Sequence, residues 1–166
     1  MNMIHIQSQF TDGQGRVAKV AYEDADSFDH LLSQKVTQCY GVCFLNDKMV
    51  VVYSGKGNHR ILPGGSIEKG ETFEECLKRE IQEESNMKVI SFAPIGYQEV
   101  HFEGDVFNQL RYVCIVEPYG EFIFDPDGSI TEIKLIDPKD YKQYFDWGEI
   151  GERIIQRAIE LKEKLG

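Results

Sequence analysis

The sequence predicts an α/β fold in which a mixed β-sheet is held between helices. Segments rich in β-branched and aromatic residues, several with alternating polar and apolar positions, recur along the 166-residue chain. One uninterrupted run of helix-forming residues separates these segments, and a second run with helical spacing ends the chain. Strands that flank one helix and precede another pack most simply as a sheet covered by helices.

Residues 1–36 are expected to form an N-terminal extension to residues 37–166, which hold the main core. Polar and apolar residues alternate in 3–10 and again in 16–22, on either side of the turn sequence Asp12-Gly13-Gln14-Gly15. This pattern is typical of a β-hairpin. A short amphipathic helix is predicted within residues 24–36, from the spacing of Phe28, Leu31, Leu32 and Val36. A chain of this length is most simply a single domain, residues 1–166.

The central helix is predicted at residues 73–85, because this run contains neither Pro nor Gly. Thr72 is its expected N-cap, with Glu75 as the capping-box partner three residues further on. Asn86 is expected to end the helix, because Asn adopts the left-handed conformation more readily than most residues.

Strands are predicted before and after this helix, at residues 37–45, 49–53, 88–100, 109–117, 122–124 and 131–136. Residues 54–60 are expected to form a loop, and residues 125–128 a turn. The last helix is predicted at 149–165, where apolar residues recur at helical spacing. A group of aromatic residues ahead of it is expected to cover the edge of the core: Tyr141, Tyr144, Phe145 and Trp147.

Composition and charge disfavour several classes of function. The formal net charge of −10 argues against non-specific binding to nucleic acid or to an anionic membrane surface. No apolar segment is long enough to span a bilayer, and the N-terminus lacks the features of a signal peptide. The histidines are scattered, which disfavours a zinc site. The cysteines lie in apolar runs, as expected for reduced core thiols of a cytoplasmic protein: Cys39, Cys43, Cys76 and Cys114.

The predicted helix 73–85 carries three glutamates on an unusual face. Glu80, Glu83 and Glu84 share the half of the helix whose apolar residues should pack on the core. Carboxylates at this spacing repel one another unless hard cations lie between them, and Mg²⁺ prefers carboxylate oxygens and water. Three glutamates alone would more often form a solvated acidic face. Their combination with the turn Pro63-Gly64-Gly65 ahead of the helix favours a metal site.

The spacing from Gly65 to Met87 closely resembles the Nudix box. Gly65 is followed by five residues and Glu71, and then by seven residues and the run REIQEESNM, which ends at Met87. Every fixed position of the box matches except one, where Asn86 stands in place of the usual Gly. Asn is the residue best able to replace Gly at positive φ. The resemblance implies the Nudix hydrolase family and its α/β/α sandwich with a mixed β-sheet.

The resemblance also implies the residues of the site. The metal ligands would be three carboxylates and one backbone carbonyl, those of Glu80, Glu83, Glu84 and Gly64. They would bind Mg²⁺, with Mn²⁺ as a substitute. Arg79 would fix a box carboxylate, and Glu71 would be a supporting acid near the metal ions or paired with Arg79. Glu83 and Glu84, with Arg79 and Glu71, are the expected catalytic residues. The family reaction is metal-dependent hydrolysis of a phosphoanhydride bond in a nucleoside diphosphate linked to another moiety.

The general base is left open between several acids. In many members of the family it is a glutamate outside the box, and in others it is a box glutamate. Glu121 ranks first among the outside candidates because it follows the strand predicted to end at Glu117, and Glu132 ranks second. The other candidates outside the box are Glu99, Glu103, Asp125 and Asp127.

The substrate class is inferred by elimination. Residues outside the box show no signature of the family members that act on ADP-ribose, dinucleoside polyphosphates, NADH or coenzyme A. A nucleoside triphosphate pyrophosphohydrolase is therefore the first hypothesis, with a small-molecule nucleotide as its partner and neither nucleic acid nor membrane. The alternatives are an ADP-ribose or sugar-nucleotide pyrophosphatase, a nucleotide-sensing module without turnover, and a protein-interaction domain with an acidic helix. A homodimer is common in the family.

Overall fold

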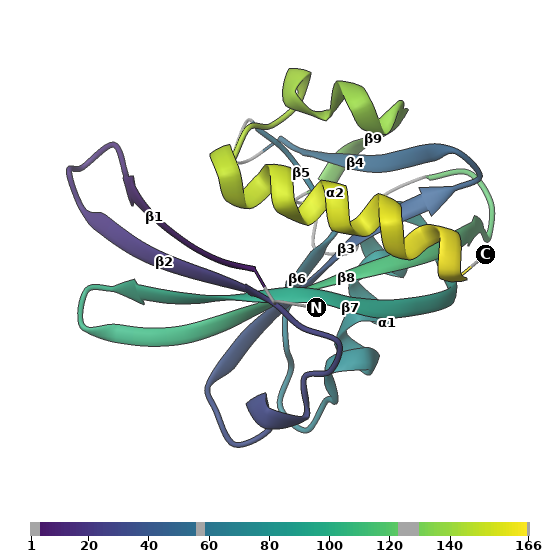
Figure 1. Cartoon of the computed structure of the whole chain (residues 1–166). Coiled ribbons are helices and arrows are strands. Elements are labelled where there is room, and N and C mark those ends of the chain that lie inside the picture. Colours follow the sequence, from purple (N-terminus) through teal and green to yellow (C-terminus); the bar gives the residue numbers. More distant parts are fainter. Residues whose placement is uncertain (1–3, 56–58, 123–129, 166) are drawn as a thin grey trace.

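A nine-stranded sheet forms the centre of the computed structural model, which describes residues 4–55, 59–122 and 130–165 (Figure 1). Its strands are β1 His5–Thr11, β2 Val17–Asp24, β3 Val36–Leu45, β4 Lys48–Ser54, β5 His59–Ile61, β6 Gly64–Ser66, β7 Met87–Phe102, β8 Asp105–Pro118 and β9 Ile130–Ile136. The helices of these described residues are α1 Phe73–Ser85, α2 Gly148–Leu165 and the 3₁₀-helices η1 Asp29–Leu31 and η2 Pro138–Gln143.

The sheet is mixed because one of its strand pairs is parallel. The strand order is β1-β2-β7-β8-β3-β4-β5, with β6 paired to β3 and β9 paired to β4. β3 and β8 run parallel, with Tyr40 opposite Arg111, whereas the other strand pairs in the described residues are antiparallel. Because β6 pairs with β3, the turn that precedes α1 lies beside an inner strand of the sheet.

The two α-helices cover opposite faces of the sheet (Figure 1). Alternate residues of β4 show this division, since successive side chains of a strand point to opposite faces. Val50 and Val52 pack in the core cluster beside α1, and Met49 and Val51 pack in the cluster beside α2. Each helix buries the apolar side that faces the sheet: Cys76, Leu77 and Ile81 in α1, and Ile150, Ile154 and Ala158 in α2. The α/β/α sandwich with a mixed sheet is confirmed.

The N-terminal hairpin and the helices predicted at 73–85 and 149–165 are confirmed. β1 and β2 pair antiparallel along their whole length. In the turn between them, the Asp12 carboxylate accepts hydrogen bonds from the backbone N–H groups of Gln14 and Arg16. α1 begins and ends at the predicted residues, and α2 begins one residue earlier than predicted.

The amphipathic helix predicted within residues 24–36 is wrong. In this described segment the structure has a single 3₁₀ turn, Asp29–Leu31. Phe28 and Leu31 are buried in the cluster beside α1, whereas Leu32 is 71% exposed. The apolar side chains therefore enter the core from an irregular segment rather than from one face of a helix.

Two short strands were not predicted. β5 and β6 lie in segments that read as a loop and a turn, and they are strands because they pair with β4 and β3. The strand predicted at 122–124 is not confirmed at Phe122, which belongs to no strand. Residues 123–124 and the turn predicted at 125–128 lie outside the described residues.

The residues predicted to close the core are in place. Tyr141 and Phe145 are buried, and Tyr144 and Trp147 pack against the same cluster. All the cysteines are buried and free of disulfides. Within the described ranges, no helix is both long and apolar enough to cross a membrane.

Candidate active site

Local contacts fix both ends of α1, the helix that carries the acidic residues of the box. Thr72 is extended, and its Oγ1 accepts a hydrogen bond from the backbone N–H of Glu75 at 3.1 Å. Asn86 has φ 55° and ψ 39°, and its backbone N–H donates to the carbonyl of Gln82 at 2.8 Å. The cap and the left-handed Asn86 are thus confirmed. Among the described residues, however, the Glu75 side chain makes no bond back to the Thr72 N–H, so the capping box predicted for Glu75 is not formed. The left-handed conformation of Asn86 explains why Asn can stand where the family box has Gly.

The two glycines ahead of α1 let the backbone approach its neighbours closely. At Gly64, which has φ 154°, a Cβ would lie 2.4 Å from the carbonyl oxygen of Cys39 and 2.5 Å from Cδ1 of Tyr40. At Gly65, a Cβ would lie 2.6 Å from the carboxyl carbon of Glu80. At Gly64 the backbone of β3 leaves no room for a side chain, and at Gly65 a side chain would displace the Glu80 carboxylate, so glycine at both positions allows β6 to pack between β3 and the acidic face of α1.

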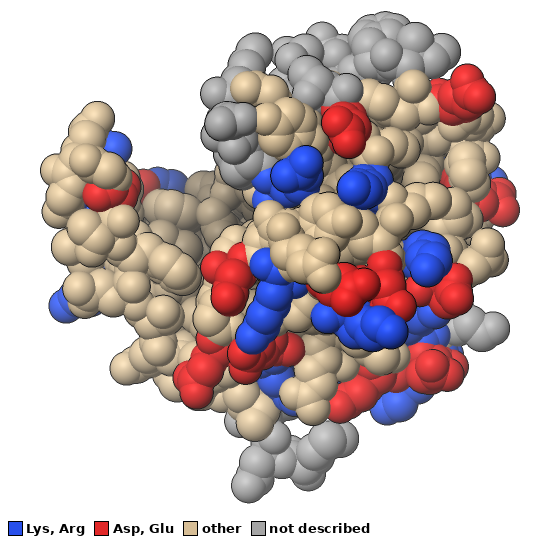
Figure 2. All heavy atoms as spheres, turned by 90° about the horizontal axis from the view of Figure 1, so that it is seen from above, with Lys and Arg blue, Asp and Glu red and all other residues tan. Residues whose placement is uncertain are grey.

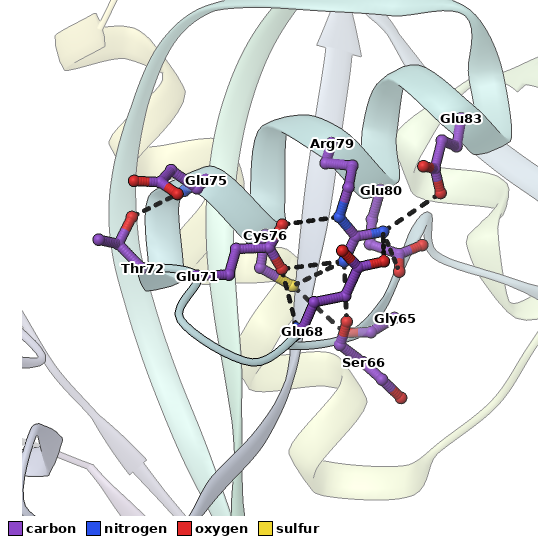
Figure 3. Close-up of polar contacts among 10 residues, drawn as sticks. All are labelled: Gly65, Ser66, Glu68, Glu71, Thr72, Glu75, Cys76, Arg79, Glu80 and Glu83. Carbon is purple, nitrogen blue, oxygen red and sulfur yellow. Dashed lines mark hydrogen bonds and ion pairs between the residues drawn. The ribbon is translucent and has the colours of Figure 1, made fainter.

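Arg79 holds the loop and the helix together (Figure 3). Its Nε and Nη2 donate to the two oxygens of Glu71 at 2.7 and 2.9 Å, a bidentate pair. Nη2 also donates to the backbone carbonyl of Ser66 at 2.9 Å. Nη1 donates to Glu80 at 3.0 Å and to Glu83 at 3.2 Å. One guanidinium group therefore sets the positions of three box carboxylates and of the strand before them.

These contacts shift the ionisation of the pair toward its charged form. The hydrogen bond from Arg79 holds the pKa of Glu71 below its ordinary value, against the opposing effect of partial burial. The backbone N–H of Glu68 adds a second hydrogen bond to Glu71, at 3.0 Å. The bond to Glu71 likewise raises the pKa of Arg79 above its ordinary value. Glu71 and Arg79 are therefore both charged at neutral pH. As a charged pair they can hold the other carboxylates of the box in place.

Two of the candidate metal ligands are nearly buried. Glu80 and Glu84 are each only 7% exposed. A buried carboxylate is costly unless it is paired. Glu80 is paired with Arg79, and Glu84 accepts a hydrogen bond from the backbone N–H of Gly64 at 2.7 Å. The acids predicted from the box and the Gly64 backbone are therefore brought together by α1 and β6.

The residues at this point fit a hard divalent cation. Their donor atoms are carboxylate and carbonyl oxygens, which Mg²⁺ prefers. In the described part of the chain, no group of three or more His, Cys, Asp or Glu side chains is arranged so that it could hold an ion by itself. Mg²⁺ sites in proteins commonly use one or two carboxylates, with water and substrate phosphate as the other ligands. Glu80, Glu83, Glu84 and the Gly64 carbonyl can supply that number.

The two leading candidates for the general base lie in different places. The segment of Glu121 is attached to the C-terminal end of α1, where Asn86 Nδ2 donates to the Glu121 carbonyl at 2.9 Å. Glu132 lies on β9 opposite Tyr53 of β4, which on its other side pairs with Arg60 of β5. Both residues are exposed. Asp125 and Asp127 lie outside the described residues.

Sequence reasoning missed two residues at this site. The Glu68 carboxylate lies 3.6 Å from Nη1 of Arg79 and adds a fourth acid around that guanidinium. The sequence shows Glu68 three positions before Glu71. In a segment that is not a helix, this spacing does not predict that the two acids lie around the same arginine. Tyr40 packs its ring against Gly64 from β3, and no local pattern predicts the pairing of these strands.

Comparison with known proteins agrees with this architecture. A family model described as the NUDIX domain matches residues 37–158. The fold is similar to that of the Bacillus subtilis pyrophosphohydrolase BsRppH, with a TM-score of 0.69 and 17% identity over 95% of this chain and 97% of that one. It is also similar to a MutT NUDIX hydrolase from Burkholderia pseudomallei, with a TM-score of 0.58 and 15% identity over 75% of this chain and 98% of that one.

A comparison with curated proteins found no match. The low identities of the solved structures show a likeness of fold. The family model shows membership of the family and not only the fold, because it matches more than half of the chain and includes the whole of the Gly65–Met87 box. The chain belongs to the Nudix family.

Proposed function

We propose that the protein is a Mg²⁺-dependent pyrophosphohydrolase that cleaves a phosphoanhydride bond of a nucleotide, with nucleoside triphosphates as the first substrate class. The observation that carries this proposal is that three of the four fixed acids of the box surround one arginine, while the fourth, Glu84, is bound to the Gly64 backbone. Glu71 and Arg79 form a bidentate pair, and Arg79 also contacts Glu80 and Glu83. A nucleotide-sensing module that no longer hydrolyses its ligand would have no need to keep these contacts of Arg79.

Each residue has a role that follows from its contacts. Glu80, Glu83 and Glu84 would present carboxylate oxygens to Mg²⁺ or Mn²⁺, beside the Gly64 carbonyl. Arg79 and Glu71 would orient these oxygens through the bonds described above. A bound Mg²⁺ would supply neutralisation of phosphate charge and a lowered pKa for water.

Glu121 is the first candidate for the general base outside the box. Its segment is bound to Asn86, one turn beyond Glu83 along α1. Glu132 is the second candidate, and a box glutamate remains the alternative.

The solved structures support the reaction class. One similar protein is described as a pyrophosphohydrolase and another as a MutT NUDIX hydrolase. The buried free cysteines favour a reducing compartment such as the cytoplasm. The homodimer that is common in the family stays a prediction.

The first test is the release of phosphate and pyrophosphate from a panel of nucleotides with Mg²⁺ or Mn²⁺. The panel holds nucleoside triphosphates, oxidised purine nucleotides, ADP-ribose, sugar nucleotides and dinucleotides. We expect turnover of triphosphates, lost in the Glu83→Gln/Glu84→Gln double variant. Turnover of ADP-ribose or sugar nucleotides instead would correct the substrate class. If no compound is hydrolysed although nucleotide still binds, the nucleotide-sensing module would be favoured over the hydrolase.

A second measurement separates a metal site from an acidic surface that binds a protein partner. Millimolar Mg²⁺ in the presence of a nucleotide should raise the melting temperature of the native chain and not that of the double variant. An unchanged melting temperature in the native chain would count against the metal site.

A further inference from the structure

A row of glutamines crosses the face of the sheet that α2 covers, beside the glycine turn of the box. Gln98 of β7 lies opposite Gln109 of β8, and Gln109 lies opposite Gln38 of β3. On its other side, Gln38 pairs with Ser66 of β6. Residues directly opposite one another in paired strands project to the same face. Tyr22, opposite Gln98, belongs to the core cluster beside α2, which identifies the face.

Arg111 lies in the next row of the same face. Its guanidinium carbon is 4.6 Å from the ring centroid of Tyr40 and 5.9 Å from that of Trp147. Arg111 is 6% exposed, and burial lowers its pKa to about 10, so it stays charged at neutral pH. No Asp or Glu among the described residues forms an ion pair with it, and its Nε has no hydrogen-bond partner there. A buried cation in this state is costly for stability alone.

The hydrogen bonds from Arg111 have a fixed direction. Arginine has no acceptor atom, so Gln109 must turn its carbonyl oxygen toward Nη2 of Arg111, at 3.3 Å. The amide nitrogen of Gln109 then donates to the carbonyl oxygen of Gln38. The chain of hydrogen bonds therefore ends on the amide N–H groups of Gln38. No described residue accepts from them.

This row lies close to the candidate metal ligands. The ring of Tyr40 packs against Gly64, whose N–H binds Glu84, and Arg111 lies over the same ring. Tyr40 therefore lies between Arg111 and the strand that carries the candidate ligand Gly64. Seen from the α2 side, the molecule is hollowed between the body and the lobe that contains the tip of the β1–β2 hairpin (Figure 2).

We propose that the band formed by Gln38, Gln98, Gln109 and Arg111, with Tyr40 and Trp147 beside it, binds the base of the nucleotide substrate. The proposal rests on the nucleotide hydrolase function proposed above. Because the chain of hydrogen bonds ends in a donor, the base that fits it presents a carbonyl oxygen, O6 of a purine or O4 of a pyrimidine, at the position where adenine and cytosine carry an amino group. Guanine and hypoxanthine are therefore preferred to adenine, and uracil and thymine to cytosine.

Binding tests this proposal without any need for turnover. Trp147 is the only tryptophan in the chain, so its fluorescence reports occupancy of the band. The native protein is titrated with GMP, IMP and AMP in the presence of Mg²⁺. We expect saturable changes with GMP and IMP, and an affinity for AMP at least tenfold weaker.

The substitution Gln38→Glu replaces the donor at the end of the hydrogen-bond chain with an acceptor. In Gln38→Glu the carboxylate still accepts from Gln109 but offers an acceptor to the base in place of a donor. We expect this variant to lose the preference for GMP and IMP over AMP. Gln9→Glu is the matched control, because Gln9 is exposed on β1 and opposite Lys19, on the other face of the sheet. It should bind like the native protein.

The outcomes separate this proposal from the hydrolase function. Equal affinities for GMP, IMP and AMP, or a preference unchanged in Gln38→Glu, would overturn base selection by this band. The absence of a fluorescence change with every nucleotide would overturn it as well. The hydrolase function is decided separately, by phosphate release from the panel and its loss in Glu83→Gln/Glu84→Gln.

Discussion

At the scale of single residues, some contacts of the site join residues that are close in the sequence, and others join residues that are far apart in it. The box residues lie within one short stretch, so their spacing alone predicted that Glu80, Glu83 and Glu84 share a helix face. The bidentate pair of Arg79 with Glu71 also spans only eight positions. The band proposed to bind the base could not be predicted in this way. Gln38 and Gln109 are 71 positions apart and meet only because β3 pairs parallel with β8.

Replacing Arg79 with lysine should cost activity rather than folding. A lysine ammonium cannot reproduce the bidentate pair with Glu71 while also reaching Ser66 and Glu80. We expect kcat to fall about 10- to 100-fold, the range seen when residues that orient metal ligands are lost. Steady-state kinetics with the best substrate of the panel would measure it.

The control for this substitution is Arg16→Lys, the same change at an exposed ion pair with Asp12 in the hairpin turn. It should leave kcat unchanged, and both variants should keep the native circular dichroism. Full activity in Arg79→Lys would show that the guanidinium does not position the carboxylates.

At the scale of elements, the ends of α1 are set by residues at those ends, whereas the short strands form only through pairing with other strands. The bounds of α1 were predicted because its cap and its left-handed end are encoded by Thr72 and Asn86 themselves. β5 and β6 were missed because three-residue strands exist only through their partners. The helix predicted in 24–36 failed because the core draws in Phe28 and Leu31 and leaves Leu32 in solvent.

Thr72→Ala tests the contribution of the cap to α1. Loss of the hydrogen bond from the Glu75 N–H to Thr72 Oγ1 should lower the free energy of unfolding by about 1 kcal/mol. Chemical denaturation followed by circular dichroism would measure this change. Thr72→Ser keeps the hydroxyl and should restore most of the loss. Equal stability of the alanine variant would mean that tertiary packing alone holds the start of the helix.

At the scale of the whole molecule, the N-terminal hairpin is attached to the last helix. The Asp24 carboxylate, at the end of β2, binds Arg153 of α2 at 2.6 Å and the hydroxyl of Tyr22 at 2.9 Å. Arg157 of the same helix donates to the carbonyl of Ile95 at 2.7 Å. Residues 1–36 make up about a fifth of the chain, so the likeness to the Bacillus subtilis structure over 95% of it includes most of them. We infer that the extension is part of the same folding unit.

Asp24→Asn should therefore destabilise the whole chain. The side chain of Asp24 is 1% exposed, and removing its charge leaves Arg153 without its partner. Breaking such a buried pair costs about 3–5 kcal/mol. The double variant Asp24→Asn/Arg153→Met should recover part of this loss, and Asp29→Asn, an exposed acid on η1, should change little. Urea unfolding followed by Trp147 fluorescence would measure all three.

The same contact predicts how stability depends on pH. Burial acts to raise the pKa of Asp24, but hydrogen bonds from Arg153, Tyr22 and the Ile4 N–H hold it below its ordinary value. A carboxylate whose pKa is lower in the folded state stabilises the fold fully above its unfolded pKa of about 4, and the contribution is lost as the pH falls through the folded pKa. The stability difference between the native chain and Asp24→Asn should accordingly be constant near neutral pH and shrink below about pH 4. A difference that stayed constant into acid would show that the cost of the variant comes from altered packing rather than from the charge, and the hairpin would then be held to α2 by its apolar contacts alone.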